Sequence, residues 1–426
     1  MKQLRPMLLA FLFVLFLYPV SVGEYSVNYS FVLYPALVVL VRQRFHKPPP
    51  LIVAGITIYL FILGLSIVYF PDMIGQTLRR LASFAIFMAA FAFAFVRVDT
   101  ELVTAFKRAI IISSVYFSAS AIFAFLGLQA IGPVDFEAKD AVGSQRFGFI
   151  YIVAFWLALL DRRQTIRPAF LNYLAVPIIF AGLFLTFSRS AFVSLGVSLA
   201  VFGLAQISDA LVRSTPQFYA RLVAIGLVLA LASVMVTRFF PLTIEYYTER
   251  LITPFAEGAL VGTLSDPDSS EGIRVVRFNE GLDFVLRHPL TGNGYLGIWT
   301  FSPSGGGSAH NQYLDTFIRV GFIGLAYYVY LLSRLLRFLR RYDAPLFWGV
   351  VGILVYGMFH ETFKESQGAV VLAMLIGMMA QHIRESAAGT VSRTWHDQSP
   401  RRQRNGRSPK TSPAANGPTV PPRAMA

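Results

Sequence analysis

Long apolar blocks recur along most of the chain, and short joints that hold charged residues or proline separate them. About 20 consecutive apolar residues let a helix cross the hydrocarbon core of a bilayer, and shorter blocks cross with the help of interfacial flanks. About twelve blocks meet this requirement. Their approximate bounds are 7–22, 26–41, 51–70, 80–96, 107–128, 147–160, 169–187, 190–207, 218–238, 311–333, 345–362 and 367–384. The pattern predicts an all-α, polytopic membrane protein with about twelve transmembrane helices.

One joint differs from the others because it runs from 239 to 310 without a block long enough to cross. Loops of this length are usually functional. Near the middle of this joint, Ser269 or Ser270 can cap the start of a helix, and His288-Pro289 ends the helical pattern. Between them an apolar stripe recurs at helical spacing, made of Val275, Phe278, Leu282 and Val285. This segment predicts an amphipathic helix of about sixteen residues.

Basic residues mark the expected inner face, since cytoplasmic joints accumulate Lys and Arg. With the N-terminus inside, the inner joints and the two ends of the chain hold about two-thirds of the 37 basic residues. Both termini are therefore expected in the cytoplasm, and the long loop on the outer side. The expected divisions are transmembrane helices 1–9 in 1–238, the outer loop in 239–310, helices 10–12 in 311–384 and a disordered, basic cytoplasmic tail in 385–426.

Composition agrees with a membrane protein, with 55% hydrophobic and 14% charged residues and no cysteine. The absence of cysteine excludes disulfides, iron–sulfur clusters and thiolate–zinc sites. A net charge of +14 suggests nucleic acid at first, but the segment from Arg238 to Ala309 holds five arginines and eight acidic residues. No aromatic residue follows Trp395 in the basic tail to stack a base. The tail suits anionic membrane lipids, and no nucleic-acid partner is expected.

Three polar groups from distant parts of the chain are expected together on the outer face. Arg189 lies in TFSRSAF, between two apolar blocks, where a guanidinium must snorkel, pair or line a polar cavity. Arg274 and Arg277 lie one turn apart on the amphipathic helix, away from its apolar stripe. His310, followed by Asn311, opens the next block. The glycine-rich stretches GNGYLG and SPSGGGSAHN are expected to be flexible and able to close over a ligand.

These motifs, in this order, resemble the O-antigen ligase and polysaccharide polymerase family of bacterial inner membranes. The resemblance rests on TFSRSAF, EGIRVVRFNEGLDFVLRHPLTGNGYLG and SAHNQYLDTFIRVGFIGLAYYVYLL, and covers roughly 140–340. It implies a multi-pass inner-membrane protein with type C glycosyltransferase character and a catalytic loop in the periplasm. The implied reaction moves a glycan from a polyprenyl-diphosphate carrier to an acceptor hydroxyl. An O-antigen ligase acting on a lipid A core sugar is favoured over an O-antigen or exopolysaccharide polymerase.

The family's catalytic residues correspond here to Arg189, Arg274 and His310. Guanidinium groups bind phosphate oxygens through paired hydrogen bonds, so Arg189 and Arg274, with Arg277 as a further candidate, are expected to hold the diphosphate. A histidine of ordinary pKa, about 6.5, is suited to take the acceptor's proton, which makes His310 the candidate base. Attack opposite the diphosphate inverts the anomeric centre. This scheme requires no metal and no other cofactor.

Other residues are expected to support this site. The candidates are Ser188, Asn311 and Arg146, the last in GSQRFG where the family often has an arginine. Two positions depart from the family pattern, because Phe278 stands where Trp is common and Arg319 stands where an acidic residue is frequent. The spacing of Arg319 from Asp315 favours an ion pair between them within the membrane.

Two polar segments have less defined roles. His360, Glu361 and Lys364 border the last outer turn, where they form either an ion-pair network or a polar wall of the same site. Asp266 and Asp268 are expected to form a turn and helix cap rather than a metal site.

A polytopic transporter or flippase is the rival interpretation. Such proteins usually place their ionisable groups near the middle of the bilayer, between repeated halves of the chain. Here the candidate groups cluster at one face and no sequence repeat relates the two halves, which favours an enzyme.

Overall fold

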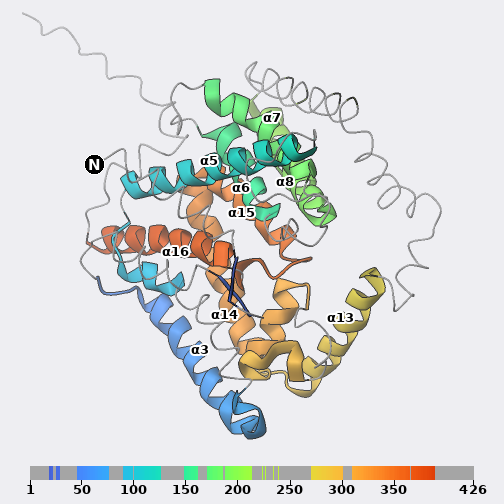
Figure 1. Cartoon of the computed structure of the whole chain (residues 1–426). Helices are drawn as coiled ribbons and strands as arrows, with labels where there is room; N and C mark the ends of the chain where they lie inside the picture. Colours follow the sequence, from blue (N-terminus) through green and yellow to red (C-terminus); the bar gives the residue numbers. More distant parts are fainter. Residues whose placement is uncertain are drawn as a thin grey trace, which may run out of the picture.

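The structure is a computed structural model that describes eleven continuous segments and four single positions. The segments are 19–22, 25–28, 46–75, 90–98, 100–125, 148–161, 170–185, 188–213, 270–300, 309–364 and 366–388, and the single positions are 223, 226, 234 and 238. Most of these residues are helical (Figure 1), which confirms the expected helical class.

The α-helices of the described segments follow the expected blocks closely. They are α3 (Pro50–Tyr69), α5 (Thr100–Phe125), α6 (Gly148–Leu160), α7 (Phe170–Leu185), α8 (Arg189–Arg213), α13 (Ser270–Arg287), α14 (Gln312–Tyr342), α15 (Ala344–Tyr356) and α16 (Ser366–Ala387). Short 3-10 helices are η1 (Pro71–Met73), η2 (Phe91–Phe95), η4 (Gly294–Thr300) and η5 (Thr362–Lys364). The amphipathic helix expected in the long loop is α13, of 18 residues.

Four of the described helices, α3, α5, α8 and α14, are long and apolar enough to cross a membrane. The apolar helices α6, α7 and α15 are shorter, with 13, 16 and 13 residues. Several expected spans fall partly or wholly outside the described residues, so the number of twelve stays a prediction. The tail expected in 385–426 also lies outside them, apart from its first four residues.

A small β-hairpin departs from the expected all-α fold. Strand β1 (Pro19–Val22) pairs antiparallel with β2 (Tyr25–Asn28), with Val20 opposite Val27. The expectation of helix at the end of the first block and the start of the second was therefore wrong. Valines and an aromatic residue favour strands, and a two-residue connection is the shortest that joins two antiparallel strands.

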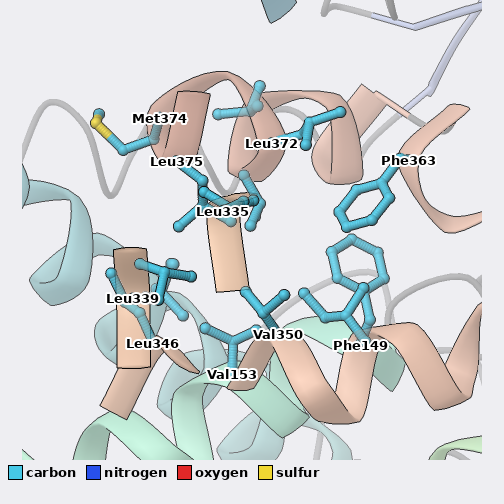
Figure 2. Close-up of a cluster of buried hydrophobic side chains, with 14 of the residues drawn as sticks. Phe149, Val153, Leu335, Leu339, Leu346, Val350, Phe363, Leu372, Met374 and Leu375 are labelled. Carbon is cyan, nitrogen blue, oxygen red and sulfur yellow. The ribbon is translucent and has the colours of Figure 1, made fainter. Parts of the chain in front are cut away.

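The core is centred on α6, which is buried on every side. All eleven residues from Gly148 to Ala158 are buried, as is typical of a helix that is apolar around its whole circumference. Helices α15, α7, α5 and α8 contact it, and α14 and α16 complete the same core. Figure 2 shows this packing, with Phe149 and Val153 of α6 facing Val350 of α15, and Leu335 of α14 beneath Leu375 of α16. The single polar group of Trp156 is satisfied, since its Nε1 donates to Ser198 Oγ at 3.1 Å.

Polar contacts tie the helix ends that the charge pattern assigns to the inner face. Lys107 Nζ of α5 lies 2.7 Å from Asp343 Oδ2, and both side chains are buried. Asp343 also caps α15, because its Oδ1 accepts the Leu346 N–H at 3.2 Å. Arg384, near the end of α16, donates to the carbonyl oxygens of Ala94 and Val96, at 2.6 and 3.0 Å. These contacts join α5 to α15, and α16 to the segment of η2, at the ends assigned to the inner face.

Breaking the buried ion pair should destabilise the protein strongly. Replacing Lys107 with Met leaves the Asp343 carboxylate buried without its cation, a change that costs about 3–5 kcal/mol. The double variant Lys107→Met/Asp343→Asn should recover part of that loss, because it removes both charges. Thermal unfolding in detergent micelles measures the order of stability.

The matched control is Arg287→Met on α13. It breaks an ion pair of similar length, Arg287 Nη2 to Asp283 Oδ2 at 2.6 Å, whose two side chains are 73% and 64% exposed. An exposed pair of this kind contributes about 0.3–0.5 kcal/mol. Equal losses of stability in Lys107→Met and Arg287→Met would contradict the structural role of the buried pair.

Candidate active site

The first turn of α8 positions Arg189. Helix α7 ends at Leu185 and α8 begins at Arg189, so the arginine lies at the joint between two helices, as the sequence predicts. Ser188 is buried and caps α8, because its Oγ accepts the Ala191 N–H at 3.3 Å. Arg189 itself is half-buried. The supporting role expected for Ser188 thus takes the form of a helix cap that orients this turn.

His310 directly precedes α14 in a strained backbone conformation. Its φ is 50°, and among the described residues it is the one non-glycine residue with positive φ. Non-glycine residues in this region cluster at functional sites, where surrounding contacts hold them. Asn311 caps α14, since its Oδ1 accepts the N–H groups of Tyr313 and Leu314, both at 3.0 Å. The His-Asn motif therefore divides into a half-buried imidazole and a helix cap.

The turn between α15 and α16 is bonded to both flanks of His310. The N–H of Ala309 donates to the buried carboxylate of Glu361 at 2.7 Å. On the other flank, the Gln312 N–H donates to the Gly357 carbonyl at 2.7 Å, and Gln312 Oε1 accepts the Phe363 N–H at 3.0 Å. Three hydrogen bonds thus hold the turn against the start of α14.

His360 extends from this turn to α8. Its Nε2 lies 2.7 Å from Ser190 Oγ, and its ring stacks on Tyr356 with centroids 4.5 Å apart. Burial, with smaller contributions from the positive charges of Arg274 and His310, lowers the pKa of His360 to about 3. Arg274 and His310 thus act electrostatically on His360, and Ser190, the residue after Arg189, is hydrogen-bonded to it.

Helix α13 presents a different face to the protein from the one its sequence predicts. Gly281 and Val285 pack against Leu314 and Ile318 of α14. Arg274 lies on the same side of the helix, two turns before Gly281 and three turns before Val285. The expected stripe was wrong in part, because Phe278 and Leu282 remain 44% and 41% exposed. The reason is steric, since a glycine allows α14 to approach more closely than a large apolar residue does. Arg277 is half-buried beside this contact face.

The GNGYLG stretch is ordered and docked, which corrects the expectation of a flexible flap. Helix α14 is broken at Gly321, where φ is 60°. Because of this break, the N–H groups of Phe322 and Ile323 donate outside the helix, to the carbonyls of Pro289 and Leu290 at 2.8 and 3.2 Å. Asn293 is fully buried and bonds within the turn to Gly297 and Thr300. Its own N–H donates to the Ile318 carbonyl at 2.8 Å. The broken helix therefore supplies the partners that order the loop.

A buried ion pair underlies this docked loop. Arg319 Nε lies 2.7 Å from Asp315 Oδ2, and the two side chains are 5% and 3% exposed, which confirms the pair predicted from their spacing. The Arg319 guanidinium lies against the backbone of Gly297, where a Cβ atom would come within 2.5 Å of Nη2. At Gly297 φ is 62°, so both space and backbone conformation require glycine.

Several expected elements lie outside the described residues. They are Arg146, Asp266, Asp268, the SPSGGG part of the second glycine-rich stretch and nearly all of the basic tail. The helix that follows Arg146 does reach the site region, because Gly148 of α6 lies against Ala191 of α8 and Tyr356 of α15. Lys364 ends η5, and only its backbone is described.

The assembled groups are suited to bind an anion and move a proton. The arginines belong to α8 and α13, the two imidazoles belong to the segments before α14 and after α15, and the acidic group Glu361 accepts a backbone N–H. Planar guanidinium groups match phosphate oxygens, and imidazole exchanges protons near neutral pH. Within the described segments, no three His, Cys, Asp or Glu side chains are grouped as metal ligands would be.

Part of the chain matches a known family. Residues 174–329 match the model of the family described as O-antigen ligase. We refer to this matched segment as the O-antigen ligase domain. This segment contains Arg189, Arg274, Arg277 and His310, and it ends within α14. The comparison with curated proteins gives no significant match.

Two residues near the O-antigen ligase domain have a larger part than their sequence indicates. His360 and Glu361 lie beyond residue 329, in a turn whose only sequence signal was its place among the expected outer joints. Both residues contact the segments that carry the candidate groups, His360 through Ser190 and Glu361 through the N–H of Ala309.

Replacing Gly297 with Ala should undock the loop of the O-antigen ligase domain from α14. A side chain there meets the Arg319 guanidinium and requires a left-handed conformation that costs about 1–2 kcal/mol by itself. Lower thermal stability in micelles and faster chymotryptic cleavage within 294–300 are the expected results.

Gly203→Ala provides the control for this substitution. Nothing lies within 4 Å of the added methyl group in α8, and alanine stabilises a helix interior by about 0.5–1 kcal/mol relative to glycine. The docked arrangement is contradicted if the two alanine variants unfold and are cleaved alike.

Proposed function

We propose that the protein is a glycosyltransferase that moves a glycan from a polyprenyl-diphosphate carrier to an acceptor hydroxyl, most specifically an O-antigen ligase that joins O-antigen to lipid A core. The O-antigen ligase domain supports a transferase of the ligase or polymerase type. The observation that carries the proposal is the convergence of groups from α8, α13 and the start of α14 around His360. An anionic leaving group needs cationic side chains such as arginine, and the acceptor proton needs a base such as histidine.

In the proposed reaction the acceptor oxygen attacks the anomeric carbon while the bond from that carbon to the diphosphate oxygen breaks. Arg189 and Arg274, with Arg277 nearby, hold the diphosphate and stabilise the negative charge that it gains as it leaves. His310 takes the proton of the attacking hydroxyl. Attack from the face opposite the diphosphate gives inversion. The arginines supply the charge that a metal provides in other transferases, so we propose metal-independent chemistry without a cofactor.

The contacts between helix ends support an outer, periplasmic site. The pair Ser190 and His360 joins two ends that the charge pattern assigns to the outer face, as does the ring contact between Phe70 and His288. The ion pair of Lys107 with Asp343 and the hydrogen bond from Arg384 to the Ala94 carbonyl join helix ends assigned to the inner face. We propose a type C fold in the bacterial inner membrane, with both termini cytoplasmic and the tail near anionic lipids.

The same geometry disfavours a transporter or flippase. Arg189 begins α8, His310 precedes α14 and His360 follows α15, so these groups gather at helix ends. Transporters usually bind substrate near the middle of the bilayer, between broken helices. One described helix, α14, is broken at Gly321, but the docked loop of the domain fills that break.

Removing the clamp or the base should abolish transfer while leaving the fold intact. Arg274→Ala removes charge stabilisation of the leaving group, with an expected loss of about 10²–10³-fold in kcat. His310→Asn removes the base but suits the positive φ, because asparagine tolerates the left-handed region, and the expected loss is about 10²–10⁴-fold. Purified protein, lipid-linked glycan and rough lipopolysaccharide form the assay.

Arg287→Ala on the same helix is the control, since this arginine is exposed and pairs with Asp283. Its rate should equal that of the wild type. Full transfer in both Arg274→Ala and His310→Asn would remove the mechanism. Product on lipid A establishes a ligase, whereas glycan ladders on the lipid carrier alone establish a polymerase.

A further inference from the structure

The position of His360 is unusual for a residue so close to the candidate site. It lies outside the segment that matches the O-antigen ligase family, yet its imidazole contacts the first turn of α8 within that segment. The ring is held on its face by Tyr356, a fully buried residue at the end of α15. An imidazole fixed both by stacking and by a hydrogen bond has a single defined orientation.

On one side, a series of hydrogen bonds joins His360 to the turn that carries Arg189. The Ala191 N–H donates to Ser188 Oγ, Ser188 Oγ lies 3.1 Å from Ser190 Oγ, and Ser190 Oγ lies 2.7 Å from His360 Nε2. Ser188 and Ser190 flank Arg189 directly. The imidazole thereby fixes the backbone on either side of this guanidinium-bearing residue.

On the other side, the turn that carries His360 fixes His310. Glu361, the next residue, accepts the N–H of Ala309, and Gly357 accepts the N–H of Gln312. His310 lies between Ala309 and Gln312 in a conformation that needs such external support. One short turn therefore connects the candidate diphosphate clamp and the candidate base, which are more than one hundred residues apart in sequence.

We propose that His360 is a positioning residue of the transfer site, which sets Arg189 and His310 in register with each other through Ser190 and the α15–α16 turn. The inference rests on the proposed function and deepens it. A transferase needs its leaving-group clamp and its base on opposite sides of one anomeric carbon, and displacements of about 1 Å can reduce rates by about 100-fold.

The surroundings of His360 explain why it stays uncharged. The charged groups that act on it are Arg274 on α13 and His310 before α14, Ser190 of α8 is hydrogen-bonded to it, and its neighbour Glu361 is engaged with a backbone N–H. Burial and the nearby cations hold its pKa at about 3. Near neutral pH it therefore neither competes for the diphosphate nor takes the proton intended for His310.

Kinetics on purified protein test the proposal with four variants. Removal of the side chain in His360→Ala should lower kcat by about 10- to 100-fold. His360→Gln places an amide near the position of Nε2, so it should restore most of the rate. Ser190→Ala should lower kcat in the same direction, and the double variant Ser190→Ala/His360→Ala should be no slower than His360→Ala, since both changes break one connection.

The pH profile separates positioning from proton transfer. If His310 is the titrating base, the fall in transfer at low pH should have the same midpoint in the wild type and in His360→Gln. The matched control is His288→Gln, the same substitution at an exposed histidine at the end of α13, which should keep the wild-type rate and midpoint. A shifted midpoint in His360→Gln would mean that His360 itself titrates during catalysis, and would overturn the positioning role.

Histidine-selective 15N NMR gives a measurement that needs no substrate. The signals lost in His360→Gln identify the imidazole, which should show the shifts of a neutral ring from about pH 8 to pH 5, whereas an ordinary histidine titrates near 6.5. The chemical shifts of the His360 signals should change in Ser190→Ala. Protonation near neutral pH, or a wild-type rate in His360→Ala, would overturn the inference alone. A wild-type protein that forms no product overturns the proposed function and the positioning role together.

Discussion

The hydrogen bond from the Ala309 N–H to the buried carboxylate of Glu361 is the contact on which the candidate site depends. A buried carboxylate needs strong partners, and here it is satisfied by the backbone that introduces His310. With the bonds between Gln312 and the same turn, it holds His310 at positive φ before α14. The same turn contacts α8 through His360 and Ser190, so the positions of both Arg189 and His310 depend on one short segment.

A second constraint is the break in α14 at Gly321. It exposes backbone groups in the middle of a long helix, and such groups must find partners away from water. The segment after α13 provides them, through the carbonyls of Pro289 and Leu290. The buried pair of Asp315 and Arg319 lies beneath the same segment. The long loop is thereby anchored to the membrane helix α14. This anchoring holds α13 so that its side with Arg274 faces the protein.

Local sequence patterns predicted much of this arrangement because their physical causes are local. The apolar blocks, the limits of α13 and the i, i+4 pair of Asp315 and Arg319 all depend on residues within a few turns. The same reasoning failed where a distant partner decided. The contact face of α13 is set by Gly281 against α14, and the glycines of GNGYLG serve docking rather than flexibility.

The sequence by itself determined that the chain is a helical membrane protein with polar groups at helix ends, since hydropathy and charge act on each segment independently. It also singled out Arg189, Arg274 and His310, through motifs that resemble a known family. Only the tertiary structure decided that His360, 170 residues from Ser190, lies beside it, and that Glu361 supports the backbone at His310. These contacts join segments far apart in the chain, and no periodicity within one segment encodes which other segment will pack against it.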